Sequence, residues 1–299
     1  MSRPILVTGA ASGLGLEVSR ELLARGRHVT VGSRDLERGR RAVEALRRRH
    51  PDASVDVLEL DLASLSSISR AVREVRETHA GLDGIVCNAA IQVVSGVQAS
   101  ADGYELTFAT NHLGHFALVA GLLDAVDDGG RIVVVSSGTH AGPEQAFGFP
   151  GPAWRAPREL ADPGLADPAP NAGRSRYATS KLANLYFAYE LAHREPRLRV
   201  NAFDPGLMPA TGLSRDYPPL ARTAYRAIAP LVSTLVPGAS SPRRSARRVA
   251  DMVTEPRFAG MTGAYVIGRR VAESSPESRD RARAVELWRE SFELVGRCR

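Results

Sequence analysis

Tyr177 and Lys181 stand four residues apart in a segment whose apolar residues recur at helical spacing. Side chains at i and i+4 project from one face of a helix, so the phenol and the ammonium would share the same space. A free tyrosine, with a pKa of about 10, exchanges protons poorly at neutral pH, but a fixed cation beside it lowers that pKa. The pair could therefore act as a proton donor and acceptor. The same spacing also occurs on ordinary amphipathic helices, so the rest of the chain must decide.

The elements around this pair alternate between short apolar runs and helical patterns. Nearly continuous apolar strands separated by helices are typical of a parallel sheet buried on both faces. We therefore predict an α/β fold, a single Rossmann-type doubly wound parallel sheet of about seven strands flanked by helices, with residues 1–299 as one domain. The expected strands are 4–8, 28–32, 55–60, 84–87, 131–136, 198–203 and 263–267; the expected helices include 102–126, 243–253 and 279–295.

Glycines follow the first expected strand at Gly9, Gly13 and Gly15, just before a helical pattern. A phosphate can approach the backbone and the free N–H groups of a helix N-terminus only where no Cβ blocks the way. Glycine-rich turns also occur without ligands, but this position after the first strand predicts a dinucleotide site. We assign to it Thr8, Gly9, Ala11, Ser12, Gly13, Leu14 and Gly15.

Arg34 follows the second expected strand, where a dinucleotide-binding sheet meets the adenosine ribose. An acidic residue there binds the 2′-hydroxyl of NAD, whereas an arginine accommodates the 2′-phosphate of NADP. Asp35 lies one position further and leaves the NAD alternative open. An ordinary surface arginine is the remaining interpretation, and we expect NADP(H). Further polar residues at strand ends are Ser33, Asp61, Asn88 and Ser137.

The composition restricts the class of protein. With 299 residues, 43% of them hydrophobic, the chain can bury a sizeable core. The net charge of +6 comes from scattered arginines with few aromatic neighbours, so we expect no nucleic-acid partner. We also expect no membrane span and no leader peptide, and two cysteines make no disulfide framework. These features predict a cytoplasmic protein without a metal site.

Together these motifs resemble the short-chain dehydrogenase/reductase family, in the family's order and over nearly the whole chain. The resemblance rests on Thr8–Gly15, Cys87–Ala90, Asn111, Ser136–Ser137 and Tyr177–Lys181. Segments 109–118, 176–194 and 204–213 look most like the branch of retinol dehydrogenases and light-dependent protochlorophyllide reductases. Ala90 departs from the family's usual glycine. Leu207 stands where the light-dependent reductases generally carry a cysteine, which argues against photochemistry.

The resemblance implies a role for each member of a catalytic tetrad. Tyr177 would exchange a proton with the substrate oxygen, and Lys181 would hold the nicotinamide ribose and lower the pKa of the tyrosine. Ser137 would align the substrate oxygen, and Asn111 would position a water for proton relay. The resemblance also completes the cofactor contacts, which we expect at Ser33, Arg34, Asp61, Leu62, Asn88, Ala89, Ala90, Tyr177, Lys181, Pro205 and Gly206.

Two segments are expected to contact the substrate. An insertion at about 138–174 joins the strand end at Ser137 to the helix of Tyr177, and loops of this length are often functional lids. We interpret it as a lid whose aromatics cover a bulky apolar substrate, the alternative being that Phe147, Phe149 and Trp154 anchor the loop to the protein. The second segment is 207–240, rich in Leu, Ala, Tyr and Pro.

The sequence thus favours an NADP(H)-dependent carbonyl reductase or alcohol dehydrogenase that acts on a bulky, largely apolar small molecule. The alternative from another class is a catalytically idle protein that binds NADP(H) as a sensor or scaffold. Family members often pair through the helices near 102–126 and 175–194, so a homo-oligomer is possible, unless the insertion covers that face.

Overall fold

The computed structural model describes residues 3–144, 146, 148–208 and 240–296. Most of the expected substrate segment, residues 209–239, therefore lies outside the described residues, and so does Phe147. All seven expected strands, the glycine turn and the tetrad residues lie within them.

One eight-stranded sheet forms the centre of the protein. Its order is β3-β2-β1-β4-β5-β6-β7-β8, and all neighbours pair in parallel except β7 and β8, which are antiparallel. The predicted doubly wound sheet is confirmed, and β8 is an additional edge strand that the sequence patterns did not indicate. The strands are β1 Ile5–Thr8, β2 Val29–Ser33, β3 Val55–Glu59, β4 Leu82–Cys87, β5 Val126–Val135, β6 Arg199–Asp204, β7 Tyr265–Ile267 and β8 Arg270–Ala272.

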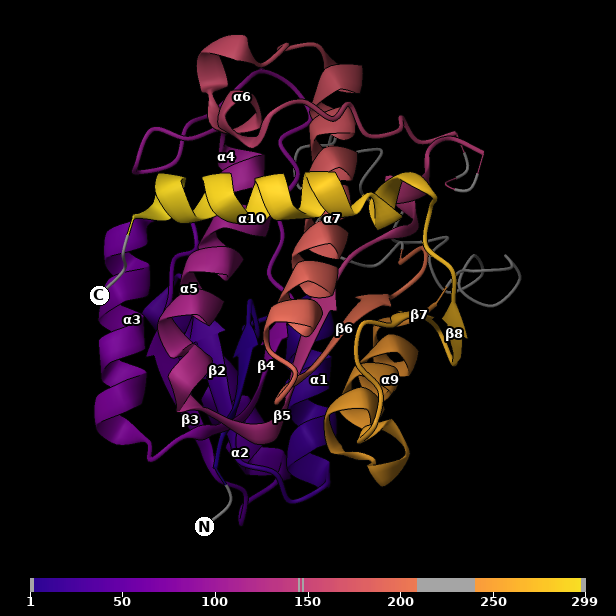
Figure 1. The fold of residues 1–299 in the computed structure, drawn as a ribbon. Coiled ribbons are helices and arrows are strands. Elements are labelled where there is room, and N and C mark those ends of the chain that lie inside the picture. The colour runs from indigo at the N-terminus through magenta and orange to yellow at the C-terminus, as the bar shows by residue number, and fades with distance from the viewer. Residues whose placement is uncertain (1–2, 145, 147, 209–239, 297–299) are drawn as a thin grey trace.

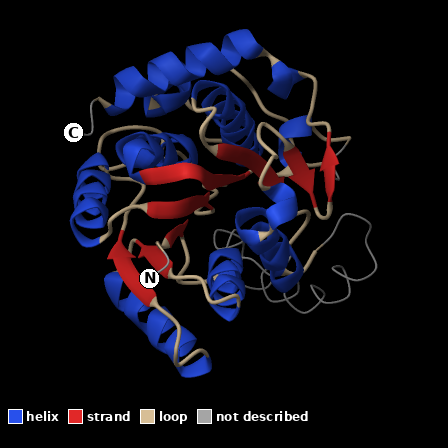
Figure 2. Ribbon diagram, turned by 60° about the horizontal axis from the view of Figure 1, so that its bottom comes forward, coloured by secondary structure: helices blue, strands red, loops and turns tan. Residues whose placement is uncertain are grey.

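Helices cover both faces of the sheet (Figure 2). Successive residues of a strand point to opposite faces, and in β1 Ile5 and Val7 join one apolar cluster while Leu6 joins the other. The first cluster packs under α1 Gly13–Ala24, α2 Leu36–Arg49 and α9 Pro242–Thr254. The second packs under α3 Leu65–Thr78, α5 Gly114–Leu122 and α7 Pro170–Arg194. The strands are apolar on both sides because both faces are buried.

The C-terminal helix α10, Arg281–Val295, lies across α5 and α7 on the outside of the second layer (Figure 1). The Trp288 ring stacks on Phe187 with centroids 6.1 Å apart and meets Phe116 edge-on at 5.0 Å. The helices expected to form a homo-oligomer are thus covered by α10, and Trp154 of the insertion also packs on Tyr186 of α7.

The expected single helix over 102–126 is wrong in detail. Helix begins only at α4, Leu106–Phe108, passes through a π-helical turn at Ala109–Leu113 into α5, and is followed by β5 from Val126. The expectation that no stretch is long and apolar enough to span a membrane is also wrong, because Leu106–Ala125 meets both criteria. However, 83% of its most apolar window is buried inside the protein, as is typical of a core helix.

Candidate active site

The carboxyl ends of β1 and β4 form the point where the strand order reverses, which is where sheets of this kind bind ligands. The turn after β1 needs its glycines: Gly9 and Gly13 have φ of +65° and +59°. A Cβ on Gly15 would lie 2.6 Å from Asn88 Nδ2 and 2.8 Å from the Gly9 carbonyl oxygen. Ser12 precedes α1 as its N-cap residue, and no capping bond from its hydroxyl occurs in the described helix. The backbone therefore forms a shallow cradle that fits a pyrophosphate at a helix N-terminus.

Thr8 joins this turn to the end of β4. The backbone N–H groups of Asn88 and Ala89 both donate to Thr8 Oγ1 at 2.9 Å, and Asn88 Nδ2 donates to the Thr8 carbonyl oxygen at 2.8 Å. His115, which sequence reasoning did not single out, lies 2.9 Å from the same hydroxyl through Nε2. Its Nδ1 donates to the Asn111 carbonyl oxygen, so Nε2 is the acceptor for the Thr8 hydroxyl. His115 thus connects the cofactor turn to the tetrad asparagine.

The end of β2 separates the two residues that left the cofactor choice open. Asp35 is the N-cap of α2, and its carboxylate accepts the Arg38 N–H at 2.9 Å. Arg34 is exposed at the strand end. The acidic side chain is therefore engaged by the helix, while the arginine side chain is exposed to solvent.

The neighbouring strand end carries two further predicted contacts. Asp61 accepts the Ala63 N–H at 3.0 Å, which fixes the turn after β3. Leu62 is buried, and its carbonyl oxygen would lie only 2.2 Å from a Cβ on Gly114. Asp61 and Leu62 thus line this side of the site. One oxygen of the Asp61 carboxylate is already engaged by the Ala63 N–H.

Helix α7 is fastened to β5 at the position of the catalytic pair. Lys181 Nζ donates to the Val135 carbonyl oxygen at 3.1 Å, and Ser136 Oγ donates to the Lys181 carbonyl oxygen at 2.8 Å. Lys181 Nζ lies 5.5 Å from the centroid of the Tyr177 ring. The predicted i, i+4 geometry is confirmed. Since an ammonium carries three donors, those beyond the Val135 bond could hold a ribose hydroxyl.

Lys181 is also the single lysine of the chain, whose other basic side chains in the Lys+Arg total of 39 are arginines. Arginine is always charged, whereas a lysine can change its protonation when buried, so the two are not interchangeable at such a position. A composition that uses arginine everywhere else marks position 181 as one that needs an amine.

The Ser137 side chain acts to lower the pKa of the Tyr177 phenol, so the structure brings these two residues together. Burial, and next the Asp204 charge, outweigh this contact and raise the pKa of Tyr177 above its usual value. Burial lowers the pKa of Lys181 to about 8. In the protein alone, burial therefore outweighs the lowering of the tyrosine pKa that was expected from Lys181.

Asn111 lies in the π-helical turn and is fully buried. Its Oδ1 accepts the Ile91 N–H at 2.8 Å, and its Nδ2 donates to the Ile91 carbonyl oxygen and to Ser180 Oγ, both at 2.9 Å. Both amide hydrogens are thus used within the protein. The Asn111 side chain holds the segment after β4 against α7. Only one lone pair on Asn111 Oδ1 remains to accept a hydrogen bond from the predicted water.

Two buried residues beside the tetrad were not predicted as site residues. Asp204, at the end of β6, accepts the Tyr265 hydroxyl at 3.0 Å and the Gly206 N–H at 2.8 Å. His140 donates from Nδ1 to the Ser137 carbonyl oxygen at 2.7 Å and accepts the Ser275 N–H on Nε2 at 3.1 Å. Because both ring nitrogens are occupied and burial lowers its pKa, His140 is a neutral support for the Ser137 loop rather than a rival proton donor.

The insertion is held to the protein at several points. The Ala153 N–H donates to Thr179 Oγ1 at 2.9 Å, and the Arg158 N–H of α6, Pro157–Ala161, donates to Glu290 of α10 at 3.1 Å. The Trp154 ring meets Tyr186 edge-on at 4.8 Å, whereas Phe149 meets Tyr177 at 6.1 Å. Trp154 is thus an anchor, and Phe149 is the described aromatic of the insertion that lies at the reaction centre.

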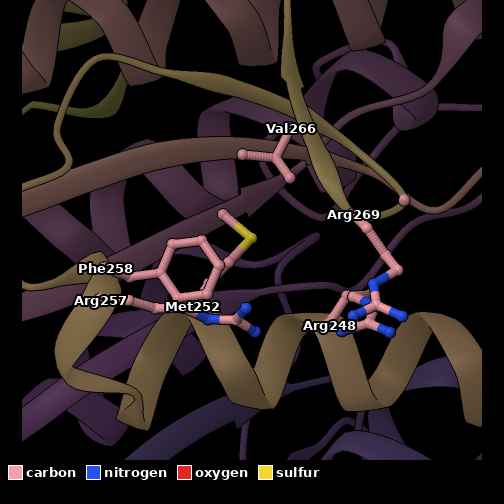
Figure 3. Close-up of a pocket in the computed structure, with 7 residues that line it drawn as sticks. Arg248, Met252, Arg257, Phe258, Val266 and Arg269 are labelled. Atoms are coloured by element: carbon pink, nitrogen blue, oxygen red, sulfur yellow. The ribbon is translucent and has the colours of Figure 1, made fainter.

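Pro205 and Gly206 follow β6 into the same edge, where Gly206 has a φ of +75° that favours glycine. The Leu207 carbonyl oxygen accepts the Ser240 N–H at 3.0 Å. A separate hollow lies between α9 and the β7–β8 turn, and Arg248, Arg257 and Arg269 are among the residues that line it (Figure 3). It contains none of the predicted site residues.

In the described ranges, no group of three or more His, Cys, Asp or Glu is placed to hold a metal ion.

Comparisons with known proteins agree with this geometry. A family model described as short chain dehydrogenase matches residues 3–148. The chain is 32% identical to a protochlorophyllide reductase of Daucus carota, over 98% of the chain and 78% of that protein. It is 32% identical to a polyprenol dehydrogenase of Danio rerio, over 97% and 86%.

Solved structures agree as well. A structure from Mycobacterium Paratuberculosis superimposes with a TM-score of 0.70 at 29% identity, covering 98% of this chain and 93% of that one. An L-sorbose reductase of Gluconobacter frateurii, solved with NADPH and L-sorbose, shares the fold with a TM-score of 0.65 at 20% identity, covering 90% and 96%.

Proposed function

The chain belongs to the short-chain dehydrogenase/reductase family, and from that premise we propose that it is an NADP(H)-dependent oxidoreductase acting on the carbonyl or alcohol of a bulky, largely apolar substrate. The observation that carries the proposal is the arrangement of buried Tyr177 and Lys181 with the partly buried Ser137 in one site beside the glycine turn. A protein that merely bound the cofactor would not need a phenol, a hydroxyl and the chain's single amine at one point.

The protein's residues divide the chemistry between them. When bound, the reduced nicotinamide supplies a hydride to the carbonyl carbon. Ser137 and Tyr177 hold the carbonyl oxygen by hydrogen bonds, and the Tyr177 O–H bond breaks as its proton passes to that oxygen. Lys181 donates to the ribose and stabilises the phenolate that remains. Alcohol oxidation is the reverse of this sequence, with the phenolate as base.

The cofactor choice is supported by the end of β2. The Asp35 carboxylate accepts a hydrogen bond at the N-terminus of α2, which leaves Arg34 as the side chain that would bind a 2′-phosphate. A bulky substrate is supported by Phe149 beside Tyr177 and by the names of the two relatives, since protochlorophyllide and polyprenol are both large and mostly apolar. Leu207 supports a reaction in the dark, because the light-dependent reductases generally carry a cysteine there.

Incubation with NADPH or NADH and a panel of ketones, quinones and aldehydes tests the proposal. We expect NADPH oxidation in darkness, larger with bulky apolar carbonyls and at least tenfold slower with NADH. Protochlorophyllide under illumination serves as the comparison. Turnover of the tetrapyrrole alone, and under illumination alone, would contradict the proposal. NADPH binding without turnover of any carbonyl would favour the idle sensor or scaffold.

A further inference from the structure

Asp204 places a buried carboxylate against the loop that begins at Ser137. It is 5% exposed at the end of β6, and its position is fixed by the Tyr265 hydroxyl and the Gly206 N–H. A Cβ on Gly138, the residue after Ser137, would lie 3.3 Å from Asp204 Oδ2. The carboxylate therefore lies against the loop that holds the substrate oxygen.

The negative charge of the same carboxylate raises the pKa of four buried titratable groups. From α7 these are Tyr177 and Lys181, from β7 Tyr265, and from the loop after β5 His140. Glu277 also raises the pKa of His140, and Tyr189 also raises the pKa of Tyr265. Of these groups, Lys181 is the one that carries a positive charge at neutral pH, because His140 is neutral and the phenols are protonated.

Lys181 is 1% exposed, and its Nζ bonds a neutral carbonyl oxygen. A buried ammonium is costly unless a charge of opposite sign lies nearby. Asp204 supplies that charge and raises the pKa of Lys181 against the effect of burial. The negative charge has the opposite consequence for Tyr177, since a second anion beside it is unfavourable.

We propose that Asp204 is a positioning residue that keeps Lys181 charged and Tyr177 protonated, and so extends carbonyl reduction to higher pH while confining alcohol oxidation to alkaline solution. The inference rests on the proposed function, and it assigns that function a favoured direction near neutral pH. Carbonyl reduction needs Tyr177 as the phenol, and alcohol oxidation needs it as the phenolate. The Asp204 charge therefore shifts the upper pH limit of reduction and the lower pH limit of oxidation together.

The single lysine allows a direct test without turnover. Protein labelled with ¹³Cε and ¹⁵Nζ in lysine has one such side chain, so its NMR signal reports Lys181 without assignment. In the wild type we expect the signal to titrate near pH 8. Asp204→Asn keeps the shape and an acceptor for the Gly206 N–H, and should lower that midpoint by about one unit or more.

Two variants separate charge from structure. Asp251→Asn removes a carboxylate buried to a similar degree on α9, and should leave the midpoint unchanged. Asp204→Ser removes the charge with a smaller neutral acceptor, and should reproduce the shift if Asp204→Asn does not fold. An unchanged midpoint in a folded Asp204 variant, or an equal shift in Asp251→Asn, would overturn the inference.

Turnover then tests the direction. With NADPH and a ketone, the alkaline limit of reduction should fall by the same interval in Asp204→Asn, and NADP⁺-dependent alcohol oxidation at about pH 6, where Lys181 is charged in both proteins, should rise about tenfold. Turnover with both limits unmoved would overturn this inference and leave the proposed function standing. A shifted lysine signal without turnover of any carbonyl would refute the proposed function and support Asp204 as the residue that sets the charge of Lys181.

Discussion

Phe149→Ala and Trp154→Ala should have opposite effects, although both remove an aromatic ring from the same insertion. Trp154 is partly buried against the core and meets Tyr186 at 4.8 Å, whereas Phe149 meets Tyr177 at 6.1 Å. A fully buried Trp→Ala substitution costs about 3–5 kcal/mol. Because Trp154 is only partly buried, we expect about 2–3 kcal/mol of lost stability, part of it from the edge contact with Tyr186.

The loss at Phe149 should appear in substrate recognition instead. Burying an aromatic ring against a ligand gains about 1.5–3 kcal/mol, and Phe149 is already half-buried, so we expect about 1.5 kcal/mol, or roughly a tenfold rise in KM for large apolar ketones. Small ketones that do not reach the ring should change less than twofold. Urea denaturation and steady-state kinetics on a large and a small ketone measure both quantities. The reasoning is refuted if Trp154→Ala alters discrimination without loss of stability, or if Phe149→Ala does the reverse.

Three further outcomes are expected. Arg34→Ala removes a charge-assisted bond of about 1.5–3 kcal/mol and should weaken NADPH about ten- to a hundredfold while NADH is unchanged; equal losses would contradict the assignment. Burial lowers the pKa of His112 to about 3 and of His115 to about 4, so the unfolded chain binds more protons below pH 6.5. Urea denaturation should therefore show about 3 kcal/mol less stability at pH 5.5 than at pH 7.5, and a flat profile would refute this. Because α10 covers α5 and α7, we expect no dimer through this face. Sedimentation velocity should therefore give the same oligomeric state for the wild type and for Trp288→Arg; a wild-type dimer that the substitution dissociates would contradict the packing.

The features that the sequence predicted are those encoded locally. Periodicity identified seven strands, because each is a continuous apolar run buried on both faces. The pair Tyr177 and Lys181 follows from helix geometry alone. The glycine turn is required by positive φ at Gly9 and Gly13.

The features that were missed depend on contacts between distant residues. Asp204 and Tyr265 are separated by 61 positions, and His115 reaches Thr8 across 107, so no local pattern could connect them. The pKa values of Tyr177 and Lys181 are dominated by burial, which the spacing of two residues does not reveal. Strand β8 contains only three residues at an open edge, too short for a periodic signal.

The central claim is that Tyr177 is the proton donor and acceptor, and Tyr177→Phe tests it most directly. The substitution removes one hydroxyl and little else, so NADPH affinity, followed by fluorescence titration, should change less than about threefold. Turnover of the best ketone of the panel should fall by at least a thousandfold, while Tyr186→Phe, which removes a hydroxyl from the same helix where it bonds the Glu277 carbonyl oxygen, should leave it unchanged. Substantial turnover by folded Tyr177→Phe would contradict the account.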